Sequence, residues 1–144
     1  MGFLKDTDYA VLIRAEISKI IDSTENQTKL LGAEKMAISQ IKNHLAGRYD
    51  VDAIFTPAPD TGEDTRDQFI VMLVIDLALY HIWSKEGPNN IPKIREQRYN
   101  DALEWLIATK KSGGADLPPI IDETGNETGD VRIWSKNVPE ENRY

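Results

Sequence analysis

The sequence contains 144 residues, 40% of them apolar and 28% charged, which is ordinary material for one globular domain with a single core. Its formal net charge of -7 argues against a duplex-binding domain held by phosphate contacts, because such a domain needs a basic surface. The lack of cysteine excludes disulfides and thiolate metal sites, and no signal-peptide core is recognised near the start, so we expect a protein of a reducing compartment.

The first half of the chain predicts two helices. The first lies near residues 8–22, where acidic N-cap candidates precede apolar residues that recur every three or four positions. The polar run 23–29 is expected to end it. A second helix is predicted over 33–49, and the linker that follows, 50–64, contains two prolines that oppose regular helix.

The third predicted helix, near 66–86, contains the most apolar stretch of the sequence. From Phe69 to Trp83 only Asp76 and His81 are polar. A helix of that stretch spans about 22 Å, which is short of the ~30 Å hydrocarbon layer of a membrane, and a central aspartate adds further cost to insertion. We therefore expect no membrane span, but a core helix that is surrounded by its neighbours.

The fourth predicted helix, near 92–111, begins at Pro92 and ends before two consecutive glycines. Residues 1–114 are thus interpreted as a small four-helix domain of the mainly α class. Residues 115–144 are interpreted as an extended C-terminal arm, because they carry seven acidic residues against three basic ones and are too polar to build a core.

The arm contains apolar residues that a free tail does not need. A short β-strand or hairpin is predicted around residue 132, and isolated strands gain little unless they pair with something. Exposed aromatic residues on such a segment are typical anchors for a partner. The predicted oligomer or partner interface is therefore Val131, Arg132, Ile133, Trp134 and Tyr144.

Asp76 is the residue most open to a catalytic interpretation, since a buried carboxylate needs a cation or hydrogen-bond donors. It could be a catalytic acid or half of a core ion pair, and the ion pair is favoured because such pairs also place acids in interiors. The candidate partners are Arg48, Arg95 and Arg98, of which Arg48 is assigned.

No other residue pattern predicts chemistry. His44 and His81 belong to no spaced metal motif and are expected to be packed or half-exposed. The acidic residues of 122–130 do not follow the order of a calcium-binding loop. We therefore predict no catalytic, cofactor-binding or metal-binding residue, no cofactor, and no enzymatic activity.

Three segments in a fixed order resemble a known family. They are Ile41–Tyr49 (IKNHLAGRY), the apolar helix with Asp76 and Leu79–His81, and Arg98–Leu106 (RYNDALEWL). Together they are similar to the Mu-like bacteriophage head–tail joining proteins, formerly a domain of unknown function. The resemblance covers residues 33–112. The linker 50–64 departs from it, because the family passes more quickly into the next helix, which indicates an inserted contact loop.

The resemblance implies a connector-type subunit in a virion, made in the cytoplasm of the bacterial host. Such subunits form a ring, expected to be a dodecamer, between the portal protein and the next tail or stopper ring protein. DNA would pass through the lumen without specific binding, and an acidic lining would suit this because like charges repel phosphate. The alternative is a small adaptor or regulatory protein that binds one protein partner through its C-terminal arm.

Overall fold

The structure is a computed structural model that describes residues 2–11, 24–86 and 89–121. In chain order the elements are a 3-10 helix, η1 (Asp6–Val11), and four α-helices, α2 (Thr24–Leu45), α3 (Val51–Ile54), α4 (Gln68–Glu86) and α5 (Lys93–Ser112). Within these described ranges there is no β-strand, and an antiparallel bridge joins Tyr49 to Pro119. The predicted mainly α class is confirmed.

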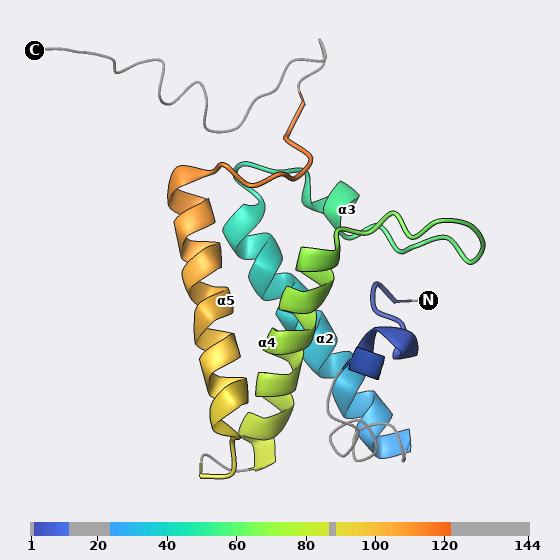
Figure 1. Ribbon diagram of the computed structural model, residues 1–144, viewed down its shortest axis with the longest axis vertical. Helices are drawn as coiled ribbons and strands as arrows, with labels where there is room; N and C mark the ends of the chain where they lie inside the picture. Colours follow the sequence, from blue (N-terminus) through green and yellow to red (C-terminus); the bar gives the residue numbers. More distant parts are fainter. Residues whose placement is uncertain (1, 12–23, 87–88, 122–144) are drawn as a thin grey trace, which may run out of the picture.

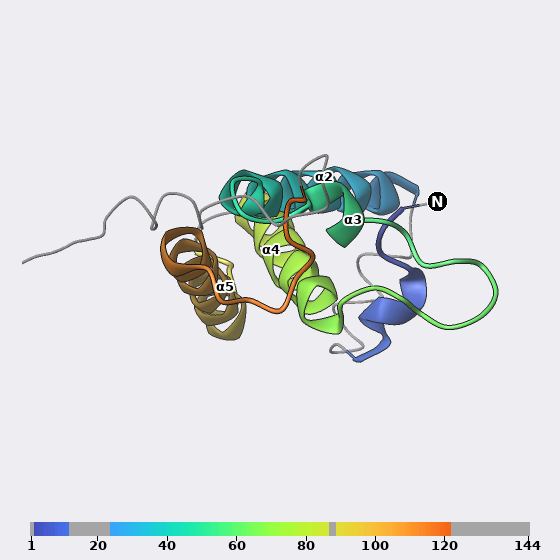
Figure 2. The ribbon, with the colours of Figure 1, turned by 90° about the horizontal axis from the view of Figure 1, so that it is seen from above.

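The three long helices form a small bundle. Figure 1 shows α4 and α5 side by side in front of α2, and Figure 2, seen from above, shows η1 next to α4 on the side away from α5. Helix α4 contacts both other long helices, and α2 and α5 also touch one another. The linker between α3 and α4 extends away from the bundle.

Helix α4 is the centre of the core, which explains its composition. Ile70, Val74, Leu77, Ala78 and Leu79 have no exposed surface. Residues Gln68–Lys85 are long and apolar enough to cross a membrane, yet half of that window is buried inside the protein. Because α2 and α5 cover its faces, burial in this core accounts for an apolar helix without a bilayer.

Helix α2 begins at Thr24, nine residues before the predicted start, so residues 24–29 of the polar run that was expected to end the first helix lie inside α2. Polar residues such as Glu, Gln and Lys are good helix formers, and they end a helix only when a breaker accompanies them. The buried stripe of the helix also starts before residue 33. It consists of Leu30, Ala33, Ala37, Ile41 and Leu45.

The segment 8–22 is described only as far as residue 11, where the chain forms η1 and not a regular α-helix. The rest of that prediction lies outside the described residues. Helix α2 also ends at Leu45 and not at the predicted Tyr49, because the chain turns after Leu45. Beyond the turn, the amide of Asp50 donates to the carbonyl of Pro118 at 2.8 Å.

The linker 50–64 is not wholly irregular, since its first residues form α3. The Asp50 side chain caps this short helix by accepting a hydrogen bond from the Ala53 amide at 3.1 Å. Ile54 is buried and Val51 packs against the core, so both ends of this short helix are attached to it. Helix α3 was not predicted, because a helix of a single turn is too short to show a repeating pattern of apolar residues.

Helices α4 and α5 agree with the predicted helices 66–86 and 92–111 to within two residues. Asp67 caps α4 by accepting from the amides of Phe69 and Ile70, at 2.9 and 3.1 Å. Gly113 ends α5 with a φ of 69°, a left-handed conformation that only glycine adopts without strain.

The first residues of the predicted arm belong to the body of the protein. The amide of Ala115 donates to the Tyr49 hydroxyl at 3.0 Å, and Ala115 and Leu117 pack on the core. Figure 1 shows this segment crossing the end of the bundle from α5 towards α3. The boundary at 114/115 is therefore too early, because apolar side chains at 115 and 117 still have a core to contact.

Candidate functional site

The carboxylate of Asp76 forms a buried ion pair, as favoured from the sequence. Its side chain is 5% exposed, and its Oδ1 lies 2.8 Å from Nε of Arg98 and 3.6 Å from Nη1 of Arg95. Both arginines come from the first two turns of α5, which faces α4 at this level. The hydrogen bond to Asp76 raises the pKa of Arg98, against the opposing effect of burial.

The assignment of Arg48 as the partner of Asp76 is wrong. Arg48 lies just after α2, and its Nε and Nη2 donate to the carbonyls of Lys110 and Lys111 at 2.8 and 2.5 Å. These carbonyls belong to the last turn of α5, where the helix dipole favours a cation. Asp76 is in the middle of α4, so an arginine at the end of the bundle is at the wrong level to reach it.

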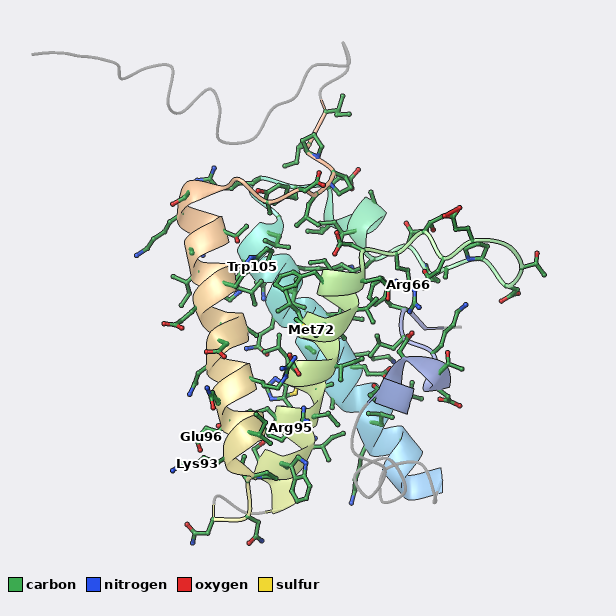
Figure 3. The ribbon with its side chains drawn as sticks, in the orientation of Figure 1. Arg66, Met72, Lys93, Arg95, Glu96 and Trp105 are labelled. Carbon is green, nitrogen blue, oxygen red and sulfur yellow. The ribbon has the colours of Figure 1, made fainter. Side chains whose placement is uncertain are left out.

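An open groove runs beside this ion pair, between η1, α4 and α5. Its volume is about 570 Å³. A second hollow of about 150 Å³ continues it along the seam of α4 and α5, and Met72, Asp76 and Arg98 line both. Figure 3 shows Met72 and Arg95 along this seam, with Trp105 nearer the C-terminal end of α5.

The rim of the groove is apolar and partly exposed. Phe69, Met72 and Ile94 are 40%, 38% and 48% exposed, although all three are large apolar residues on regular helices. The ring of Phe69 meets the edge of Trp105 with 4.9 Å between centroids. Exposed apolar residues that gather on one face around a hollow are typical of a protein-binding surface.

Arg66 fixes the η1 wall of the groove, a role that no sequence pattern predicted. Its guanidinium uses all five N–H donors, on the carbonyl of Phe3 and on the carboxylates of Asp8 and Asp64, at distances from 2.7 to 2.9 Å. Arg66 is only 7% exposed. Its hydrogen bonds to the two carboxylates raise its pKa, despite burial.

The pKa of Asp8 reflects the same cluster. Burial alone would raise it, but the hydrogen bonds from Arg66 and from the Lys5 amide hold it below its ordinary value. The pKa of Asp64 is also lowered, mainly by its hydrogen bond from the Arg66 side chain. Both carboxylates therefore stay charged, and η1 remains attached to the start of α4.

A second link holds η1 on α2. The Tyr9 hydroxyl donates a short hydrogen bond to Oε1 of Glu34, and both residues are buried. Burial raises the pKa of Glu34, while the hydrogen bond from Tyr9 opposes that effect. Burial, together with the negative charge of Glu34, also raises the pKa of Tyr9.

The two histidines are half-buried, as expected, and each binds to Gln40. Nε2 of His81 lies 2.7 Å from Oε1 of Gln40, and Nδ1 of His44 lies 2.8 Å from the Gln40 carbonyl. The Gln40 amide donates onward to the Tyr99 hydroxyl at 3.2 Å. Burial, with a smaller effect from the charge of Lys85, lowers the pKa of His81. This cluster ties α2, α4 and α5 together.

The described part of the chain contains no group of three potential metal ligands. The acidic residues of 122–130 and the predicted interface lie outside the described residues. That interface consists of Val131, Arg132, Ile133, Trp134 and Tyr144.

No protein-family model, curated protein or solved structure matches this chain.

Proposed function

We propose that this chain is a structural subunit of a ring-shaped connector between the head and the tail of a bacteriophage. The observation that carries the proposal is the groove on α4 and α5, together with the smaller hollow that continues it and the exposed apolar residues Phe69, Met72 and Ile94 that line the two. A subunit that works by contacting copies of itself and adjacent proteins needs such a surface. The choice of a head–tail connector as the assembly rests on the resemblance of residues 33–112 to head–tail joining proteins.

The partners proposed are other copies of the chain, the portal protein on one side, and the next tail or stopper ring on the other. The site of action is the virion, at the head–tail interface, after synthesis in the host cytoplasm. The net charge of -7 suits a subunit around a DNA channel, because a negative lining repels phosphate and lets the duplex slide. A strongly basic lumen would count against this part of the proposal.

The ion pair at Asp76 supports a structural role for this carboxylate. Its charge is compensated by Arg98 and Arg95, which is what a buried structural carboxylate requires. A connector subunit performs no chemistry, so its buried charged groups are expected to stabilise the fold and to position helices.

The experiment compares the full chain with a variant that lacks residues 131–144, each mixed with the portal protein encoded in the same genome. Electron microscopy of the full chain is expected to show a ring on the portal. The variant is expected to keep its helical circular dichroism and to form no ring. A one-to-one complex with a single protein would favour the adaptor alternative, and rings of the truncated variant would contradict the role of the arm.

A further inference from the structure

We propose that the groove between α4 and α5 receives the C-terminal segment, residues 122–144, of a neighbouring copy of the chain. This inference rests on the proposed function, and it names the contact by which one subunit of the ring grips the next.

The groove combines an apolar rim with an arginine, Arg98, that can donate further hydrogen bonds. Among the described residues Arg98 donates one hydrogen bond, from Nε to Asp76, and its side chain is 38% exposed. Its terminal nitrogens can therefore donate to a further carboxylate at the groove. A guanidinium beside exposed apolar side chains binds a ligand that is both acidic and apolar.

The C-terminal segment is both acidic and apolar, and its acidic residues precede its apolar ones. Residues 122–130 carry four acidic residues and no basic one, and Val131, Ile133 and Trp134 follow directly. An acidic residue of the first part can pair with Arg98 while an apolar anchor of the second part fills the hollow beside Met72. The aspartates of the larger hollow, Asp8 and Asp76, are paired with arginines, whereas the exposed Asp101 lines only the smaller hollow. The acidic part is therefore expected at the larger one.

The place where the described chain ends favours a neighbour over the same copy. The backbone before Ile121 is fixed to the junction of α2 and α3, by the bridge from Pro119 to Tyr49 and the hydrogen bond from Asp50 to Pro118. The groove is lined by η1, α4 and α5 only, and no residue of α2 contributes to it. Figures 1 and 2 show the described chain after α5 crossing the end of the bundle to the junction of α2 and α3, so the segment starts at that end and not beside the residues that line the groove.

The length of the segment permits this reach. Residues 122–144 in an extended conformation span up to roughly 75 Å, which exceeds the distance across a small domain. A strand or extended peptide that leaves one subunit and lies on the next is a common way to link copies in a ring, since each subunit both donates and accepts the segment.

The test uses the full chain with p-benzoylphenylalanine in place of Trp134, as a mixture of ¹⁴N- and ¹⁵N-labelled copies. The mixture is irradiated with and without the portal, and rings are scored by electron microscopy in the same samples. Mass spectrometry is expected to find cross-links between labelled and unlabelled copies that join position 134 to residues of α4 or α5 around Met72.

A matched pair of variants controls for non-specific contact. Met72 and Met36 are both helical methionines, 38% and 47% exposed, but Met36 is on α2 and does not line the groove. Met72→Glu places a charge in the contact and is expected to lower the yield of interchain cross-links by about tenfold or more. Met36→Glu is expected to leave the yield unchanged, with both variants keeping their helical content.

The outcomes separate this inference from the proposed function. Rings with cross-links to another surface, or only within one copy, would overturn the groove as the docking site and leave the connector proposal standing. Equal yields for Met72→Glu and Met36→Glu would overturn it as well. If neither rings nor interchain cross-links form, both the inference and the proposed function fail.

Discussion

Arg66 and Asp8 join parts of the chain that are 58 residues apart, through hydrogen bonds of 2.7 and 2.9 Å from the two terminal nitrogens of the guanidinium to the two carboxylate oxygens. This bidentate pair attaches η1 to the residues just before α4, and it thereby builds one wall of the groove. Figure 3 shows Arg66 on the η1 side of α4.

Replacement of Arg66 is expected to destabilise the protein. Arg66→Gln removes the charge that compensates the half-buried Asp8, so we expect the free energy of unfolding to fall by about 2–4 kcal/mol. Urea denaturation followed by circular dichroism measures the change. Lys35→Gln, at an exposed position of α2, is the control and is expected to stay within about 0.5 kcal/mol of the unmodified protein.

The same variant should change the dependence of stability on pH. The pKa of Asp8 is lowered from its ordinary 3.8, so its contribution is present above that value and is lost as the pH falls through the folded-state pKa. When unfolding is measured from neutral to acid pH, the free energy of unfolding is expected to fall more steeply for the unmodified protein than for Arg66→Gln. Parallel curves would mean that the pair contributes nothing to acid sensitivity.

Asp76→Asn tests the ion-pair interpretation against the catalytic one. The variant leaves Arg95, which is 4% exposed, without its carboxylate, and we expect a loss of about 3 kcal/mol in the free energy of unfolding. A double-mutant cycle with Arg98→Gln is expected to give a coupling energy of about 1–3 kcal/mol. An Asp76→Asn protein as stable as the unmodified one would contradict the structural role.

Tyr9→Phe is expected to destabilise the protein more at neutral pH than in acid. Burial raises the pKa of Glu34, so its folded-state stabilisation is present below its ordinary 4.5 and is lost as the pH rises through the folded-state pKa. Loss of the Tyr9 donor raises that pKa further and makes the charged form more costly. The expected difference is about 1–3 kcal/mol at neutral pH, shrinking below pH ~4.

Two glycine substitutions should have opposite signs. Gly113→Ala places a Cβ at a φ of 69° and 3.0 Å from Nη1 of Arg48, so we expect a loss of about 1–2 kcal/mol. Gly32→Ala, inside α2 with nothing within 4 Å of the new Cβ, is expected to gain about 0.5–1 kcal/mol. Melting temperatures of the two variants check both. A stabilised Gly113→Ala protein would mean that the α5 cap is not required.

The helices that could be predicted well are those whose local sequence indicates by itself which residues are buried and where the helix ends. Helix α4 is apolar on nearly every side, and α5 is flanked by Pro92 and Gly113, so the local sequence indicates where each helix lies. The start of α2 could not be placed in this way, because its first residues are polar, and a polar helix resembles a loop in its composition.

The candidate site was only partly predictable for a related reason. Burial of Asp76 follows from its neighbours on α4, and the need for a cation follows from burial. The choice between Arg48 and Arg98 depends on which turn of α5 lies at the level of Asp76, and that is decided by the packing of the helices. The role of Arg66 depends on contacts with Phe3 and Asp8, which are distant in the sequence, and no local sequence pattern predicts such contacts.

The mass of the complex between the full chain and the portal protein, measured by light scattering, tests the connector proposal most directly. The chain alone gives the reference mass, because subunits of this kind can remain monomeric until they dock. We expect the portal to gain one copy of the 16.3 kDa chain for each of its own subunits. A single bound copy, or no binding to the portal at any concentration, would contradict the proposed function.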